Sequence, residues 1–377
     1  MYSVFQLRTK VVFGNGCRGR IGQYARELNA DRAVVFVDPG VEKSGTADLV
    51  FGSLDECGIT YEVFRDVREE PVAADVMAAV TWARRFRPDI VIGMGGGSAI
   101  DLGKAVAFIY PNSGSIQEYM AGKEAENPNL PVIAVPTTAG TGSEVSIGAV
   151  VIDPDKQWKG GLASPYLAPH YALVDPETLV SVPKSVALNT GLDAFGHAIE
   201  SFTSKGATLL TDPIALEAIS LVYRNLGPFL DGQDRPGHAP ALLAASTMAG
   251  ISFRNTMLTL PHALAHAIGG RYHIPHGVLI GMATVPTLKF NADYCEERYT
   301  RLAPVLGVKT DPKNGVPQAV LDWMDRLGFR HRLSDYQVKP DDLPLLAREA
   351  MKVTRAIASN PRPLSQDDVM AVLQTML

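Results

Sequence analysis

Two segments in the second half of the chain carry residues whose types and spacing suit a metal site. Asp193 and His197 occur in "GLDAFGHAIE", and His262 and His276 occur in "LPHALAHAIGGRYHIPHG". Residues four apart lie on one face of a helix, as Asp193 and His197 would. His262 and His266 have the same spacing. Single histidines on apolar helices are often packed core residues, but two such pairs and a further imidazole favour a site of three histidines and one carboxylate. That donor set suits Fe(II), Zn(II) or a related divalent ion.

Two loops in the first half suit a phosphate ligand. In "DIVIGMGGGSAIDLGKAVAFI" a buried strand leads through glycines into a helix predicted to begin near Ala99. The loop "PTTAGTGS" follows a second strand, "PVIAV". Glycines allow close backbone approach, and free N–H groups at a helix start attract pyrophosphate. Loops that follow two consecutive strands of one sheet indicate a single dinucleotide. The candidate phosphate-binding residues are Gly96, Gly97, Ser98, Thr137, Thr138 and Thr141.

A competing motif lies nearer the N-terminus. Residues 14–19, "GNGCRG", match the dinucleotide fingerprint G-x-G-x-x-G, and Asp38 follows about twenty residues later, as the fingerprint requires. We favour the two later loops, because Arg18 and its bulky neighbours crowd this turn, but the motif remains an alternative. In either arrangement Asp38 closes the strand "RAVVFV" and is expected to bind the adenosine ribose, which favours NAD over NADP. The plainer interpretation of Asp38 is a turn residue before Pro39.

The pattern of elements changes in the middle of the chain. Residues 1–183 alternate β-branched runs such as "KVVFG", "RAVVFVD", "ITYEVFR" and "ALVDPETL" with amphipathic stretches such as 72–86, which predicts a parallel α/β sheet. Residues 184–377 show apolar spacing of i, i+3, i+4, which predicts an all-helical domain. The expected helices of this domain include 185–203, 212–228, 240–252 and 340–356. Pro183 is a plausible boundary, since proline restricts the preceding residue.

Composition excludes several classes of protein. The chain has 377 residues, 20% of them charged, and a net charge of -5, which gives no electrostatic reason to expect nucleic acid or a membrane as a partner. No apolar run of about 18 residues and no export signal is evident, so we expect a cytoplasmic protein. The three cysteines, Cys17, Cys57 and Cys295, are far apart. This spacing disfavours disulfides and thiolate metal sites, so any metal is expected on histidines and carboxylates.

The segments "GGGSAID", "PTTAGTGSE", "GLDAFGHAIE", "HALAHAIGGRYHIPHG" and "NPRPLS", in this order, resemble the iron-containing (group III) alcohol dehydrogenases. The resemblance implies an α/β dinucleotide-binding domain followed by an all-α domain, an architecture shared with dehydroquinate synthase. It implies a metal bound by Asp193, His197, His262 and His276. It also places Gly97, Ser98, Thr137, Thr138, Thr141 and Lys159 beside NAD, assigns the ribose to Asp38, and makes His266 a candidate for proton transfer.

The expected activity is therefore that of a metal-dependent, NAD(H)-dependent alcohol dehydrogenase that interconverts a small primary alcohol or diol and its aldehyde. Fe2+ is the first candidate for the metal, with Zn2+ as another possibility, and a homodimer or larger homo-oligomer is expected. Alternatives are a glycerol dehydrogenase, a maleylacetate reductase, a reductase of an aldehyde with an anionic tail, or a non-catalytic NAD-binding or metal-binding protein. Arg254 and Met257 lie in a segment that is usually smaller and less charged in the family. They leave the substrate open, since Arg254 suits either a structural ion pair or an anionic tail.

Overall fold

The computed structural model describes residues 3–154 and 158–377. The chain divides into two compact units. One comprises Leu7–Pro183, and the other combines Lys184–Leu377 with the N-terminal stretch through Gln6. Gln6 is tied to the second unit, because its backbone N–H donates to Asn255 Oδ1 at 2.7 Å.

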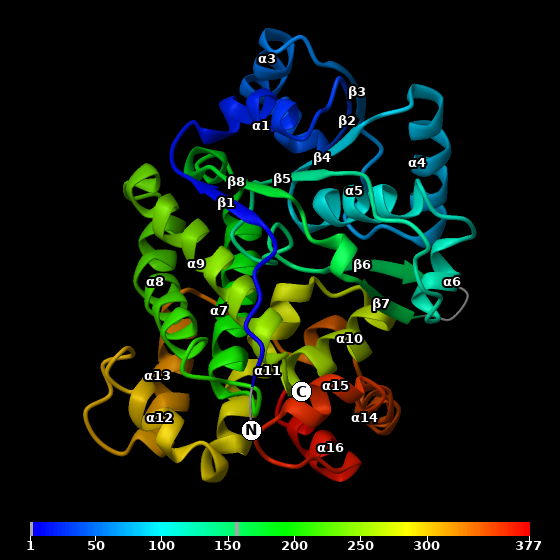
Figure 1. Ribbon diagram of the computed structural model, residues 1–377. Coiled ribbons are helices and arrows are strands. Elements are labelled where there is room, and N and C mark those ends of the chain that lie inside the picture. Colours follow the sequence, from blue (N-terminus) through cyan, green and yellow to red (C-terminus); the bar gives the residue numbers. More distant parts are fainter. Residues whose placement is uncertain (1–2, 155–157) are drawn as a thin grey trace. The chain divides into compact units, whose positions relative to one another are not determined.

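A six-stranded parallel sheet forms the centre of the Leu7–Pro183 unit, with the strand order β1-β8-β5-β4-β2-β3 (Figure 1). Its strands are β1 (Lys10–Phe13), β2 (Arg32–Val37), β3 (Thr60–Phe64), β4 (Ile90–Gly95), β5 (Val132–Pro136) and β8 (Tyr171–Val174). The β-branched runs of the sequence correspond to these strands. A parallel sheet in this position matches the expected fold class.

Both faces of the sheet are buried. On β2, Val34 and Phe36 pack with α4, α5 and α6, whereas Val35 and Val37 pack on the other face with η1, α1 and α3. This alternation explains why the strands are nearly continuous apolar runs. The covering elements are η1 (Cys17–Arg20), α1 (Ile21–Glu27), α3 (Asp48–Glu56), α4 (Ala73–Phe86), α5 (Gly97–Ile109) and α6 (Ile116–Met120). The short helix α2 (Pro39–Lys43) follows β2 directly.

The strand order reverses between β2 and β4. The chain runs from β2 outward to β3 and then crosses to β4 on the opposite side of β2. Ligands of open α/β sheets bind at the carboxyl ends of strands beside such a switch point. Here Asp38 follows β2, and its backbone N–H donates to the carbonyl of Met94 in β4 at 3.2 Å. The fold therefore brings Asp38 next to the glycine loop that ends β4.

An antiparallel hairpin, which the sequence analysis did not anticipate, accompanies the parallel sheet. Strands β6 (Gly148–Asp153) and β7 (Trp158–Ala163) pair from Gly148 opposite Ala163 to Asp153 opposite Trp158. The hairpin packs against α5 and α6. Its buried residues Ala149, Val151 and Leu162 complete the core on that face of the sheet.

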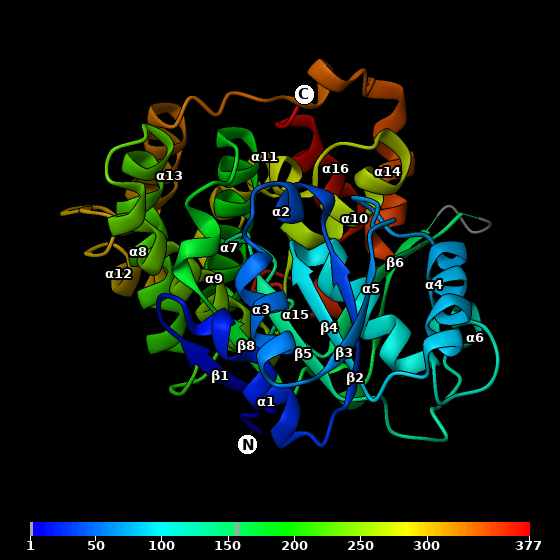
Figure 2. The ribbon, with the colours of Figure 1, turned by 90° about the horizontal axis from the view of Figure 1, so that it is seen from above.

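The second unit consists of helices among its described residues. Helix α7 packs against α8, α9 and α11, and α10 packs against α11 (Figures 1 and 2). The long helices are α7 (Lys184–Thr203), α8 (Asp212–Leu230), α9 (Arg235–Thr256), α10 (Leu260–Tyr272), α11 (His276–Asn291) and α13 (Pro312–Arg326). Shorter ones are α12 (Glu296–Leu302), α14 (Leu343–Met351), α15 (Thr354–Ser359) and α16 (Gln366–Gln374). Within the described ranges, no helix combines the length and the apolar character needed to cross a bilayer.

The expected single helix over 340–356 is divided. A 3-10 turn at Pro340–Asp342 precedes α14, and α15 begins after Val353. Val353 leaves the helical region with ψ 62°. Both α14 and α15 contact α10. The apolar period of 340–356 predicted helical structure, but it did not show that the chain changes direction at Val353.

Candidate metal and nucleotide sites

Three helices of the second unit bring one carboxylate and three imidazoles together. Asp193 and His197 come from α7, His262 from α10, and His276 is the first residue of α11. The Nε2 atoms of the three histidines lie 3.8, 3.8 and 3.6 Å, respectively, from Asp193 Oδ1. Asp193, His197 and His262 are buried, and His276 is half-buried.

The close approach of α11 to α7 depends on a glycine. A Cβ added at Gly277 would collide with the backbone carbonyl oxygen of Asn189 on α7. Only the residue without a side chain allows the first turn of α11 to sit this near α7. Gly277 therefore helps to bring His276 within reach of Asp193.

A further buried carboxylate, which the sequence analysis did not single out, orients one of the imidazoles. Glu200 Oε1 lies 2.6 Å from His262 Nδ1, while Glu200 Oε2 accepts hydrogen bonds from the backbone N–H of Thr259 at 2.7 Å and from its hydroxyl at 3.2 Å. Burial raises the pKa of Glu200 to about 7, opposed chiefly by the backbone hydrogen bond from Thr259. A carboxylate on Nδ1 directs Nε2 of the same ring toward a metal. Glu200 lies seven residues after Asp193 on α7, and this helical spacing is the signal that would have identified it.

The donor set fits a divalent metal ion. Ligand atoms about 2.1 Å from a tetrahedral ion lie about 3.4 Å from one another, close to the observed separations from Asp193 Oδ1. His262 Nε2 is buried and has no hydrogen-bond partner within the described residues, so a metal would satisfy it. Burial, together with His197 and His266, lowers the pKa of His262. The lowered pKa keeps the imidazole in the neutral form that binds metals.

The four candidate ligands do not converge equally. Ligand atoms of Asp193, His262 and His276 all lie within 4.8 Å of one another. His197 reaches the same Asp193 oxygen, and its ring stacks on that of His262 with centroids 4.6 Å apart. On its other side His197 stacks on Phe253 of α9 at 4.5 Å.

His266, the expected proton-transfer residue, lies one turn after His262 on α10. Its side chain is half-buried, and its ring centroid is 6.0 Å from that of His276. Arg254, on α9, is half-buried and donates to Gln6 Oε1 at 3.4 Å. Met257, the C-cap residue that follows α9, is 44% exposed.

The candidate nucleotide residues of the Leu7–Pro183 unit gather beside the switch point of the sheet. The backbone N–H of Thr137 donates to the Gly95 carbonyl at 2.9 Å. A Cβ built on Gly97 would lie 2.7 Å from Thr141 Cγ2, and one on Gly96 would lie 3.4 Å from Thr138 Oγ1. The two loops that follow β4 and β5 are therefore in direct contact.

A buried lysine of α5 donates hydrogen bonds to the loop that follows β5. Lys104 is fully buried, and its Nζ donates to the Ser143 carbonyl at 2.9 Å and to Ser146 Oγ at 3.0 Å. Asp101 lies 3.6 Å from the same ammonium and also accepts from the Ser143 hydroxyl and, at 2.9 Å, from the backbone N–H of Val150. This network fixes the loop against the start of α5. Both charged residues lie in the segment "DIVIGMGGGSAIDLGKAVAFI", but their spacing alone does not predict this network.

The start of α5 fits a pyrophosphate. The helix begins at Gly97, two residues before the predicted start, and its N-cap, Gly96, provides no side-chain hydrogen bond to the first turn. Thirteen residues of helix thus begin with uncapped backbone donors. The Ser98 hydroxyl donates to the Glu69 carbonyl. Lys159 lies in β7 opposite Ile152, and its side chain is outside the described part of the chain.

Asp38 caps α2. Its Oδ1 accepts from the Gly40 backbone N–H at 2.7 Å. This capping uses one carboxylate oxygen and holds the side chain at the carboxyl end of β2, where an adenosine ribose binds in dinucleotide folds.

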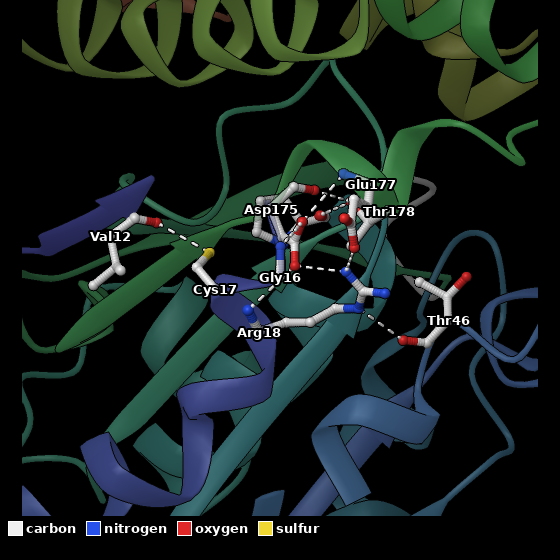
Figure 3. A network of polar contacts seen from close by, with 9 residues as sticks. Val12, Gly16, Cys17, Arg18, Thr46, Asp175, Glu177 and Thr178 are labelled. Atoms are coloured by element: carbon white, nitrogen blue, oxygen red, sulfur yellow. Dashed lines mark hydrogen bonds and ion pairs between the residues drawn. The ribbon is translucent and has the colours of Figure 1, made fainter. Parts of the chain in front are cut away.

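The competing glycine motif at residues 14–19 binds a side-chain carboxylate of the protein itself. The backbone N–H groups of Gly16 and Arg18 donate to the two oxygens of Asp175 at 3.1 and 3.2 Å. Arg18 Nη1 donates to Asp175 Oδ2 at 2.6 Å and to Glu177 at 3.0 Å (Figure 3). Asp175 is fully buried. This carboxylate fills the place in which a phosphate would sit, which argues against a dinucleotide at residues 14–19. Burial raises the pKa of the Cys17 thiol, in the same turn, to about 12.

Comparison with known proteins identifies the family of this chain. Residues 8–176 match the iron-containing alcohol dehydrogenase family, and residues 187–377 match the C-terminal domain of the same family. The chain is 32% identical to the sulfoacetaldehyde reductase of Bilophila wadsworthia over 97% of this chain and 96% of the relative. The structure of a 1,3-propanediol oxidoreductase superimposes with a TM-score of 0.95 at 29% identity, covering all of both chains. The NAD+ complex of a sulfoacetaldehyde reductase from Bifidobacterium kashiwanohense gives a TM-score of 0.91 at 29% identity, covering 100% and 99% of the two chains.

The chain belongs to the iron-containing alcohol dehydrogenase family. It is a metal-dependent, NAD-dependent oxidoreductase that interconverts an alcohol and an aldehyde.

Proposed function

We propose that this enzyme interconverts a small primary alcohol or diol and its aldehyde at a divalent metal held by Asp193, His197, His262 and His276. The observation that carries the proposal is the convergence of three imidazole Nε2 atoms on one Asp193 oxygen at 3.6–3.8 Å. Fe2+ is the first candidate, and Zn2+ satisfies the same donors. When bound, the metal polarises the substrate oxygen and NAD(H) accepts or supplies the hydride.

Side chains of the protein orient a ligand, transfer the substrate proton and limit access of water. Glu200 holds the His262 ring so that its Nε2 faces Asp193. We propose that His266, half-buried one turn away, takes the substrate proton during oxidation and returns it during reduction. Phe253 covers one face of His197 and limits water on that side.

For the nucleotide, we propose that the N-terminus of α5 binds the pyrophosphate and that Asp38 accepts the adenosine ribose hydroxyls. The loop that follows β5 carries the other proposed contacts. The proposed nucleotide residues are Asp38, Gly96, Gly97, Ser98, Thr137, Thr138, Thr141 and Lys159. The contact between the two loops and the uncapped first turn of α5 support this placement.

A second candidate is reduction of an aldehyde with an anionic tail. Arg254 is the cation considered for such a tail, and it lies on α9, the helix that also carries Phe253. The similarity to sulfoacetaldehyde reductases points the same way. A guanidinium suits a sulfonate or carboxylate through paired hydrogen bonds.

One experiment tests both candidates. Protein stripped of metal is reconstituted separately with Fe(II), Zn(II), Mn(II) and Co(II), and a panel of neutral and anionic aldehydes and alcohols is assayed by NADH absorbance. We expect turnover only with a metal present, and the better substrates decide between the neutral and anionic classes. Metal-loaded protein that turns over no member of the panel would contradict the proposal.

We also propose a homo-oligomer, a dimer or larger, in the cytoplasm. Strand β1 is an edge of the sheet, and its Val11 and Phe13 side chains are 36% and 51% exposed. Apolar side chains on an unpaired edge are a natural surface for a second copy. The three cysteines are free thiols, which agrees with a reducing compartment. Light scattering measures the oligomeric state, and a monomer at assay concentrations would contradict the first of these proposals.

A further inference from the structure

Met257 combines two features that folding alone does not favour. Its backbone has φ 70° and ψ 155°, a region that is essentially reserved for glycine. Its large apolar side chain is 44% exposed. Backbone strain of this kind costs about 1–3 kcal/mol and concentrates at active sites and ligand clamps. A residue that is both strained and poorly buried therefore suggests a role other than stability.

The neighbours of Met257 hold this conformation from both sides. Its backbone N–H donates to the Phe253 carbonyl at 2.8 Å, and the carbonyl of Thr256 accepts from Ser204 Oγ at 2.7 Å. Two residues later, the backbone N–H of Thr259 donates to the buried Glu200 carboxylate. Met257 and Leu258 thus form a short bridge between two anchored residues.

At each end of this bridge, one side chain connects the backbone to a candidate metal ligand. Phe253, which accepts the Met257 N–H through its carbonyl, stacks its ring on His197 at 4.5 Å. Glu200, which accepts from Thr259, also contacts His262 at 2.6 Å. The strained bridge therefore lies beside the metal site, within the same helical unit.

We propose that Met257 determines substrate specificity by standing at the rim of the metal site and limiting the length of the carbon chain that a bound aldehyde or alcohol can carry. The inference rests on the proposed function and extends it to a substrate class, namely short straight-chain aldehydes and their alcohols. In this proposal the strained backbone holds the exposed thioether side chain at that rim. A side chain in this place discriminates between substrates by their size. In an apolar site, a difference in size between two substrates changes the ratio of their kcat/KM values by about tenfold or more.

The test separates the side chain from the strain. Met257→Ala removes most of the side chain but keeps a Cβ at positive φ, whereas Met257→Gly removes both. The matched control is Gln337→Gly, an exposed residue of the same unit with φ 64° that contacts none of the candidate ligands in any described interaction. For each protein, the ratio of kcat/KM for hexanal to that for propanal is measured together with the Tm.

We expect both Met257 variants to raise the ratio about tenfold or more, while only the glycine variants raise the Tm. An unchanged ratio in active Met257→Ala and Met257→Gly would overturn the inference. So would a change confined to Met257→Gly, which would assign the effect to the backbone, or an equal change in Gln337→Gly. A wild-type enzyme that reduces no aldehyde would instead count against the proposed function.

Discussion

Replacing Glu200 by glutamine changes one functional group in the support of the proposed metal site. The carboxylate accepts on both sides, with one oxygen toward His262 Nδ1 and the other toward Thr259. A glutamine has one oxygen and one NH2 group, so it satisfies only one side. If the NH2 faces Thr259, two donors meet. If it faces His262, Nδ1 must accept, and the ring proton moves to Nε2, the atom that would bind the metal.

Either orientation weakens metal binding without removing a ligand. Loss of such a supporting carboxylate typically lowers metal affinity by 10–100-fold, which corresponds to about 1.4–2.7 kcal/mol. Thr259→Val removes only the hydroxyl bond at 3.2 Å and keeps the backbone bond, so its effect is expected to be smaller. The matched control is Glu297→Gln, an exposed carboxylate of the same unit.

The assay is a competition titration of metal-free protein with Zn(II) or Co(II) against a chromophoric chelator, with circular dichroism to verify folding. We expect metal affinity to be highest, and equal, in wild type and Glu297→Gln, lower in Thr259→Val, and lowest in Glu200→Gln. A folded Glu200→Gln protein with the wild-type metal affinity would refute the reasoning.

Three further predictions follow from the two sites and the Asp175 network. Wild type should use NAD(H) far better than NADP(H), because Asp38 repels a 2′-phosphate. Asp38→Gly should reduce the difference in kcat/KM between the two cofactors. A wild-type preference for NADP(H) would show that Asp38 does not lie at the adenosine ribose. Asp175→Ala leaves Arg18 buried without its main partner and should lower the free energy of unfolding by about 3–5 kcal/mol, so denaturant titration showing a change below about 1 kcal/mol would contradict the structural role of the network. His266→Ala should retain metal and NADH binding while kcat falls about 100-fold, and an unchanged kcat or a loss of metal would exclude proton transfer by this residue.

The sequence predicted the elements that depend on local patterns. Apolar β-branched runs predicted the parallel strands, because both faces of this sheet are buried. The spacing of Asp193 and His197 predicted their common helical face, and the two lie 3.8 Å apart. Local periodicity failed where the chain turns, as at Val353, and it gave no indication of the β6–β7 hairpin.

Contacts between residues that are distant in sequence account for the other features that the sequence did not predict. The turn at residues 14–19 meets every local requirement of a dinucleotide fingerprint. The carboxylate that fills it comes from Asp175, 157 residues beyond Arg18, and no property of the motif itself reveals that partner. Glu200 was within reach of the sequence, since it shares a helical face with Asp193. Its contact with Thr259, however, depends on how α10 packs beside α7.

Metal content is the most direct test of the central claim that Asp193, His197, His262 and His276 form the metal site. Elemental analysis of wild type, His276→Ala and His273→Ala compares a proposed ligand with an exposed histidine three residues earlier. His276 is only half-buried, so its truncation should leave the fold intact, which circular dichroism verifies. The account predicts about one divalent ion per chain in wild type and in His273→Ala, and a marked loss in His276→Ala. Equal metal content in all three folded proteins would contradict it.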